Sequence, residues 1–160
     1  MKKYLNGIEE MIGNTPILKL NRFFPGYNIF AKLEYYNPTF SIKDRAAFNM
    51  VLQKIKSGII KSGDVIIEAT SGNTGLGLCL ASIVFNLKFI AVVFDDISFE
   101  KINMLKGYGA TVIICDSKLN SNEKGGYVWV ATEISKKFEN VHLIDQFNNI
   151  DNPLAHYYLT

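Results

Sequence analysis

Short, continuously apolar segments alternate with longer helical patterns along most of this chain of 160 residues. Such alternation is typical of parallel strands joined by crossover helices. The segments expected to form strands are residues 28–33, 65–69, 88–94, 111–115 and 141–144. The segments expected to form helices are residues 43–56, 75–85, 98 to about 107–109, and 126–138.

The composition of the strands indicates how the sheet is covered. Residues 65–69 (VIIEA) and 90–94 (IAVVF) are apolar almost throughout rather than at every second position, as expected where helices cover both faces of a sheet. The sequence therefore predicts an open, doubly wound parallel α/β sheet with right-handed crossovers. Functional sites of such sheets form beyond the carboxyl ends of the strands. Here these ends are followed by the loops after Leu33, Ala69, Phe94 and Ile144.

Polar residues and glycines mark the expected helix ends. Ser41 can cap the helix over residues 43–56, with Asp44 three residues further on and Gly58 just past its end. Ser98 is expected to cap a later helix.

The bulk composition excludes several classes of protein. Hydrophobic residues make up 48% of the chain and charged residues 20%, as in an ordinary globular domain. The net charge is +2 without a basic run, which argues against nucleic acid as a partner. The longest apolar run, LGLCLASIVF, is too short to cross a membrane, and no signal peptide is present, so we expect a cytoplasmic protein. Cys79 and Cys115 lie in apolar stretches without metal-ligand spacing, which favours buried thiols in a reducing compartment.

The loop at residues 69–75 (ATSGNTG) has the composition of an anion site. Its glycines allow a tight turn, while hydroxyl groups and the free N–H groups of the following helix can bind a carboxylate or phosphate. Two alternatives remain: a plain polar turn in which Thr74 caps the helix, and a dinucleotide site in which Asp95 binds a ribose. The glycines do not form G-x-G-x-x-G, and a Walker A sequence is absent.

The loop at residues 34–45 leads into a helix with Lys43 near its start. The helix dipole disfavours a cation there, so we expect a lowered pKa for Lys43 and a neutral amine able to form a Schiff base. The alternative is a surface lysine paired with Asp44.

Ordered motifs along the chain resemble the cysteine synthase family of fold-type II pyridoxal-phosphate enzymes, which includes cystathionine beta-synthase. The resemblance covers essentially all 160 residues. It rests on IGNTPILKLN (12–21), AKLEYYNP (31–38), SIKDR (41–45), EATSGNTGLGL (68–78), ISFEKINMLKGYGATVI (97–113) and DQFNNIDNPLAHY (145–157).

The resemblance implies a cofactor, pyridoxal 5′-phosphate, and roles for particular residues. Lys43 would form the Schiff base with the cofactor and later move the substrate's α-proton, and Asn73 would bind the cofactor's phenolic oxygen. The implied reaction is a β-replacement on an O-activated L-serine, with sulfide as one nucleophile, as in cysteine biosynthesis. The residues implied to hold the amino acid's carboxylate are Thr70, Ser71, Gly72, Thr74 and Gln146.

The resemblance also implies a domain organisation. The chain corresponds to the N-terminal half of the family, with residues of about 38–145 as a smaller α/β subdomain and residues 1–37 and 146–160 as pieces of a larger domain. The family's cofactor-phosphate loop and the group facing the pyridine nitrogen belong to the other half. We therefore expect a homodimer or a separately encoded C-terminal half as partner, and a catalytically silent fragment is the alternative. Apolar residues that would pack on that half are expected to be exposed: Ile17, Leu18, Leu20, Phe23 and Phe24.

Two positions depart from the family pattern. Thr39 and Phe40 stand where glycines are usual, and Phe40 is expected to narrow the pocket or alter the turn. The GGY sequence at residues 125–127 resembles the 2,3-diaminopropionate synthase branch of siderophore pathways, which pairs a phosphorylated serine with an amine nucleophile. A nicotinamide-dependent dehydrogenase is a further alternative, with Asp95 as its main support.

Overall fold

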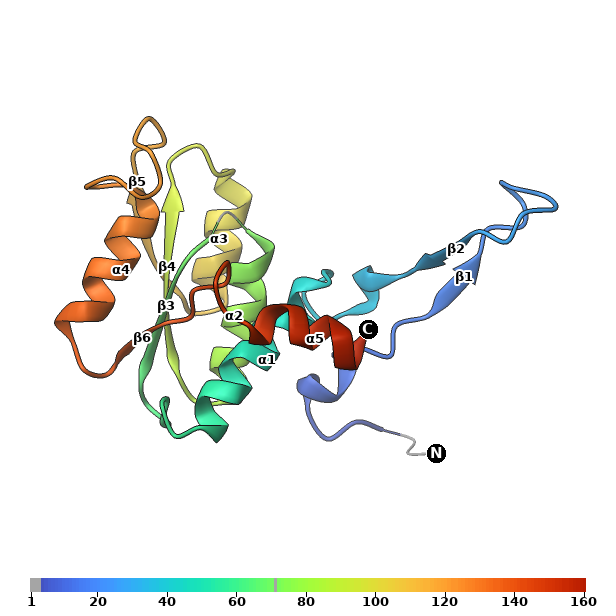
Figure 1. Ribbon diagram of the computed structural model, residues 1–160, viewed down its shortest axis with the longest axis horizontal. Coiled ribbons are helices and arrows are strands. Elements are labelled where there is room, and N and C mark those ends of the chain that lie inside the picture. The colour runs from blue at the N-terminus through green and yellow to red at the C-terminus, as the bar shows by residue number, and fades with distance from the viewer. Residues whose placement is uncertain (1–3, 71) are drawn as a thin grey trace.

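A computed structural model describes residues 4–70 and 72–160. An α/β body carries a two-stranded ribbon that projects from one end (Figure 1). The strands are β1 (Ile17–Lys19), β2 (Phe30–Lys32), β3 (Val65–Ala69), β4 (Lys88–Phe94), β5 (Thr111–Cys115) and β6 (Val141–Leu143). The α-helices are α1 (Lys43–Lys56), α2 (Asn73–Val84), α3 (Phe99–Gly107), α4 (Tyr127–Lys137) and α5 (Asp151–Leu159). Short 3₁₀ turns are η1 (Ile8–Met11) and η2 (Glu34–Tyr36).

The main sheet is parallel, in the order β5-β4-β3-β6. Val65 at the start of β3 is in register with Lys88 of β4 and with Val141 of β6. The bounds of β3, β4 and β5 agree with the predicted ranges, and the predicted parallel α/β architecture is confirmed.

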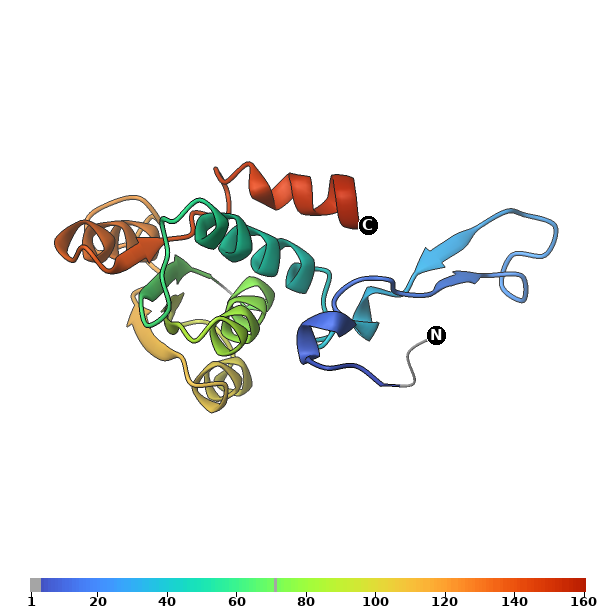
Figure 2. The ribbon, with the colours of Figure 1, turned by 90° about the horizontal axis from the view of Figure 1, so that it is seen from below.

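Helices cover both faces of this sheet, which explains its continuously apolar strands. Ile66 and Val93 point into a core shared with α1, α2 and α3. Their neighbours Ile67 and Val92 point to the opposite face and pack under α4. Figure 2 shows α1 lying between α2 and α5, so α1 connects the body to the C-terminal helix.

The prediction for residues 28–33 was wrong about pairing. The strand exists as β2, but it pairs antiparallel with β1 in a separate ribbon and not with the parallel sheet. An antiparallel pair needs only a short return loop, here residues 20–29, whereas a parallel strand would need a crossover. Strand β1 was not predicted, because three exposed residues leave no periodic burial pattern.

The ribbon carries most of the apolar residues expected to be exposed. Phe23 is 80% exposed, and Ile17, Leu18 and Phe24 are also exposed, while Leu20 is half-buried. Helix α5 was not predicted as a helix. None of the helices in the described ranges is long and apolar enough to cross a membrane.

A buried ion pair ties the N-terminal segment to α1. Arg45 is 1% exposed, and its guanidinium donates to both carboxylate oxygens of Glu34, at 2.8 and 2.9 Å. Thr15 donates its hydroxyl to the same carboxylate at 2.5 Å, and Lys32 donates to Thr15. The Arg45 hydrogen bond holds the pKa of Glu34 at about 2. This network sets where the chain enters α1.

Candidate active site

Lys43 is the first residue of α1 and is half-buried. Its backbone N–H donates to the Ser41 hydroxyl at 3.1 Å, although the capping position itself is Ile42. The Asp44 carboxylate is fully buried and accepts from the backbone N–H and the hydroxyl of Thr39. Asp44 is therefore occupied by Thr39, and the structure does not support the surface pair between Lys43 and Asp44.

Phe40 adopts a glycine-like backbone conformation in the turn before α1, and its side chain lies away from the pocket. It adopts a φ of 61°, in the left-handed region where glycine is usual. Its N–H closes the turn on Asn37 at 2.9 Å, and its side chain is 71% exposed and absent from the lining of the cavity described below. Of the two expected effects of Phe40, narrowing of the pocket is not found in the described lining, and a change in the turn stays a prediction.

Gly77 brings α2 close enough to α1 to hold Lys43 beside the 70–75 loop. A Cβ built on Gly77 would lie 2.8 Å from the Ala47 Cβ and 3.0 Å from the backbone oxygen of Lys43. Only glycine allows such a close approach of two backbones. The second glycine of the GLGL part of the motif thus positions the lysine.

The 70–75 loop supplies part of its own hydrogen bonding. The Thr70 hydroxyl accepts from the N–H groups of Gly72 and Gly75, at 3.3 and 3.1 Å. We had expected the N–H groups of this turn to be free, but those of Gly72 and Gly75 are not. In the described part of the chain, the N–H groups of Asn73 and Thr74 have no acceptor. The capping position of α2 is Gly72, so the alternative in which Thr74 caps the helix is wrong.

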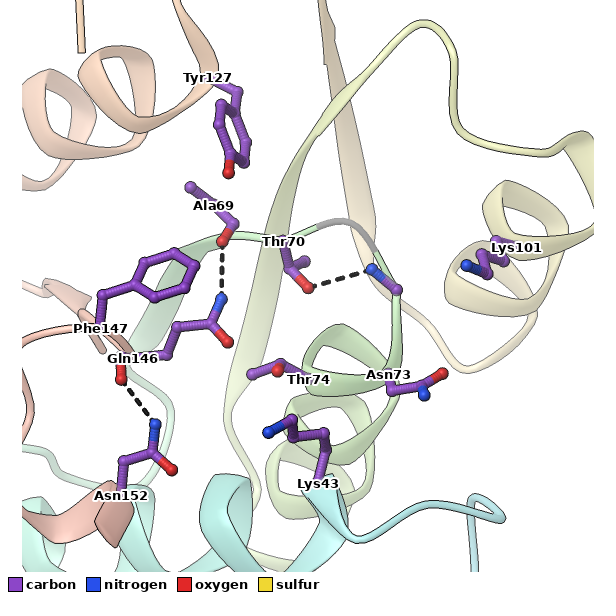
Figure 3. A pocket seen from close by; sticks show the side chains of 11 residues that line it. Lys43, Ala69, Thr70, Asn73, Thr74, Lys101, Tyr127, Gln146, Phe147 and Asn152 are labelled. Carbon is purple, nitrogen blue, oxygen red and sulfur yellow. Dashed lines mark hydrogen bonds between the residues drawn. The ribbon is translucent and has the colours of Figure 1, made fainter. Parts of the chain in front are cut away.

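Six of the seven predicted site residues line one cavity of about 450 Å³ (Figure 3). Lys43 comes from α1, and Gln146 follows β6. The remaining four belong to the turn after β3: Thr70, Gly72, Asn73 and Thr74. Ser71 lies outside the described residues. As the strand-end rule predicts, the loops after Ala69 and Ile144 meet here.

The orientation of the side chains differs between Lys43 and Asn73. The amine of Lys43 points toward the space bounded by Thr74, Gln146 and Asn152 (Figure 3). The carboxamide of Asn73 points away from Lys43 in the same view. Contact between Asn73 and a ligand bound to Lys43 would require rotation of the Asn73 side chain.

Several lining residues were missed by the sequence reasoning: Ala69, Lys101, Tyr127, Phe147 and Asn152. Tyr127 begins α4 directly after Gly125 and Gly126, and a Cβ on Gly126 would lie 2.1 Å from the Asn120 oxygen. The GGY sequence was the available signal for this side chain, since a tight turn there presents Tyr127 to the cavity. Lys101 lies in the motif at residues 97–113, but that motif was not linked to the site.

The described lining contains two lysines and no carboxylate. Neither Lys43 nor Lys101 forms an ion pair within the described ranges. Together with the free N–H groups of the turn, this charge favours an anionic ligand.

The dinucleotide alternative finds no support in this geometry. Asp95 lies outside the cavity lining and accepts from the backbone N–H of Ser117 at 3.0 Å. His142 bonds Asp64 at 3.0 Å near the amino ends of the strands, which is the opposite edge of the sheet. No group of side chains that could hold a metal ion occurs in the described part of the chain.

Comparison with known proteins agrees with the predicted family. The sequence model described as "Pyridoxal-phosphate dependent enzyme" matches residues 8–160. Cysteine synthase B of Salmonella typhimurium is 42% identical over 160 residues, covering 98% of this chain and 51% of the relative. A probable cysteine synthase of Bacillus subtilis is 39% identical over 158 residues, covering 98% of this chain and 50% of the relative.

A similar fold occurs in a solved structure of O-ureido-L-serine synthase, with a TM-score of 0.90 and 35% identity. The match covers 98% of this chain and 48% of that one. The chain thus spans about half the length of these relatives.

Proposed function

Because the chain belongs to the family of pyridoxal-phosphate-dependent enzymes, we propose that it supplies the reactive lysine and the carboxylate-binding turn for a cysteine-synthase-like β-replacement. The substrate would be an O-activated L-serine, and the product would belong to cysteine biosynthesis. The observation that carries the proposal is the single cavity in which Lys43 meets the Thr70–Thr74 turn and Gln146.

The residues present fit the cofactor. Lys43 offers an amine that forms no ion pair within the described chain, in a cavity of about 450 Å³ that a small aromatic ligand can enter. When bound, pyridoxal phosphate supplies an electron sink for negative charge at the substrate's α-carbon. Asn73 would bind the cofactor's phenolic oxygen after rotation of its side chain.

Lys43 would act twice. Its Nζ would be the group that holds the cofactor before the substrate binds. As a free amine held close by the start of α1, Lys43 would then take the proton from the substrate's α-carbon and carry it during the reaction. Half-buried and facing the space beside Thr74, the amine would stay within reach of that carbon.

The turn after β3 would hold the substrate's carboxylate. The N–H groups of Asn73 and Thr74 lie at the positive end of α2 and have no acceptor within the described chain. The Thr70 hydroxyl already accepts two N–H groups, so its remaining role toward the carboxylate is as a donor. Gln146 donates a side-chain N–H to the Ala69 oxygen at 3.0 Å and also bonds the Glu68 carboxyl group through its side chain, and its carboxamide would meet the ligand from this fixed position. Ser71 is proposed from the motif alone.

The domain organisation follows as part of the same proposal. Residues of about 38–145 would form one subdomain, and residues 1–37 and 146–160 would belong to a second one that includes the remainder of the relatives' length. The exposed ribbon supports this division, since Phe23 and Ile17 are 80% and 65% exposed. A second chain, or a further segment of the same protein, would cover them and bind the cofactor's phosphate.

One observation keeps a second nucleophile in consideration. Tyr127, which follows the two glycines of the GGY sequence, lines the cavity and turns its hydroxyl toward it (Figure 3). The diaminopropionate synthase branch, with an amine as nucleophile, is therefore the second candidate. Supplying the protein with an activated serine and either sulfide or an amino acid separates the two.

Reductive labelling tests the proposal. The protein is incubated with pyridoxal phosphate and reduced with borohydride, and the modified lysine is identified by peptide mass spectrometry. We expect the label on Lys43, its loss in Lys43→Ala, and its retention in Lys54→Ala, which changes the other end of the same helix. A label on another lysine, or no label in the intact protein, would refute the assignment.

A further inference from the structure

Glu68 is a buried carboxyl group that has no role in the proposed reaction. It is the fourth residue of β3, in a strand that is otherwise apolar, and it is 2% exposed. A carboxyl group is costly to bury in the middle of a sheet unless it is hydrogen-bonded. Its partners therefore indicate what the group is for.

Those partners belong to the loop after β6, 77 residues away in the sequence. One oxygen of Glu68 accepts from the backbone N–H of Asp145 at 2.7 Å, and the other accepts from that of Gln146 at 3.3 Å. Asp145 has a φ of 58°, which residues other than glycine rarely adopt. The carboxyl group thus holds a turn that its own sequence does not favour.

Gln146 is held on three sides. Glu68 accepts its backbone N–H, Asn152 donates to its backbone oxygen at 2.7 Å, and its side chain donates to the Ala69 oxygen at 3.0 Å. Figure 3 shows the bonds from Asn152 and to Ala69, with the Gln146 carboxamide facing the cavity. We propose that Glu68 is a positioning residue that fixes the carboxamide of Gln146 for the substrate's carboxylate, an inference that rests on the proposed function.

The surroundings of Glu68 make its protonation measurable. Burial raises its pKa to about 7, against the opposing hydrogen bonds from the backbone N–H groups of Gln146 and Asp145 and from the Gln146 side chain, and the Asp145 carboxylate adds to the rise. On the same face, α4 contributes uncharged Val128 and Thr132 to the small cavity beside Glu68. Asp145 is the charged neighbour in the described lining of that cavity. Protonation of Glu68 should therefore change the amide chemical shifts of Asp145 and Gln146, whose N–H groups donate to it.

The first test needs no variant and no cofactor. Amide chemical shifts of Asp145 and Gln146 in the intact protein are followed by NMR between pH 5 and 9. We expect both to titrate together with a midpoint near pH 7, as the cited pKa of about 7 requires. Flat shifts at both positions across this range would overturn the proposal.

The second test compares Glu68→Gln with Asp64→Asn. Asp64 serves as the control: its carboxylate also accepts a backbone N–H, that of Lys61 at 2.9 Å, and bonds His142 of β6 at 3.0 Å, but at the edge of the sheet opposite the cavity. In Glu68→Gln we expect the shared midpoint to disappear and hydrogen exchange at Asp145 and Gln146 to become at least about tenfold faster. Loss of a bond to a charged acceptor should also weaken binding of an amino-acid substrate to the cofactor-loaded protein by about ten- to a hundredfold. Labelling of Lys43 should persist.

Asp64→Asn should change none of these quantities. Equal losses of substrate binding in both variants would mean a general structural effect and would overturn the positioning role. Unchanged exchange in Glu68→Gln would do the same. Absence of label on Lys43 in the wild type would instead refute the proposed function, while the NMR and exchange measurements on Glu68 could still be interpreted.

Discussion

The close contact between Gly77 and α1 predicts that overpacking in Gly77→Ala destabilises the protein, by an amount that follows from the geometry. Gly77→Ala adds a Cβ that would lie 2.8 Å from the Ala47 Cβ and 3.0 Å from the Lys43 backbone oxygen. Carbon atoms in contact normally stay about 3.5–4.0 Å apart. Neither neighbour is the end of a flexible side chain, so α1 must move away from α2 by about 0.7–1.2 Å, the difference between that contact distance and 2.8 Å.

Two opposing effects decide the change in stability. Alanine favours a helix over glycine by about 1 kcal/mol, while overpacking a filled core costs about 1–3 kcal/mol. Gly107→Ala provides the control, because Gly107 is also helical, in α3, and a Cβ there meets nothing within 4 Å. Both variants share the helix effect, so Gly77→Ala should be less stable than Gly107→Ala by about the overpacking cost, 1–3 kcal/mol.

Urea unfolding of the wild type and both variants measures this difference. We expect Gly107→Ala at or above the stability of the wild type and Gly77→Ala below Gly107→Ala. Displacement of α1 should also slow reductive labelling of Lys43 in Gly77→Ala alone. Equal free energies of unfolding in the two variants, with equal labelling rates, would refute the claim that Gly77 sets the distance between these helices.

Two further predictions concern ionisable groups outside the cavity. The pKa of Glu34 is about 2 in the folded protein against 4.5 for the free side chain. Ionised Glu34 should therefore contribute about 3 kcal/mol to the free energy of unfolding, present above pH 4.5 and lost as the pH falls toward 2. Urea unfolding at stepwise lower pH measures this loss, which should be smaller in Arg45→Met than in the wild type. Burial raises the pKa of the Cys79 thiol to about 12. A thiol reagent at pH 8 should leave Cys79 unmodified in the native protein and modify it after unfolding, and modification of the native protein would contradict its burial.

Local patterns in the sequence were enough to predict the body of the fold. Strands β3, β4 and β5 were predicted to the residue. In β3 and β4, burial on both faces leaves unbroken apolar runs bounded by polar and glycine residues. The edge strand β5 is also an apolar run, although its Ile114 is 51% exposed. The predicted capping of α3 by Ser98 is confirmed, since its side chain accepts from the Lys101 N–H. Such signals depend on residues close together in the chain, and these can be read without knowing the tertiary contacts.

Parts of the candidate site could be predicted for the same reason. Carboxyl ends of parallel strands meet at one edge of the sheet, and the ordered motifs place site residues there. The sequence therefore predicted that Lys43, Gln146 and the Thr70–Thr74 turn lie together, and those of these residues that the structure describes line one cavity. The sequence also indicated, through two consecutive glycines, that the start of α4 was unusual. It did not indicate that Tyr127 would face the cavity.

The tertiary structure alone decided which polar groups remain available for chemistry. Thr70 uses its oxygen on the N–H groups of Gly72 and Gly75, and Glu68 reaches a loop that lies 77 residues further along the chain. It also decided that β2 pairs with β1 in a ribbon. A hydrophobic run repeats and so leaves a pattern in the sequence, whereas a single hydrogen bond between distant residues leaves none, and its geometry exists only once the chain has folded.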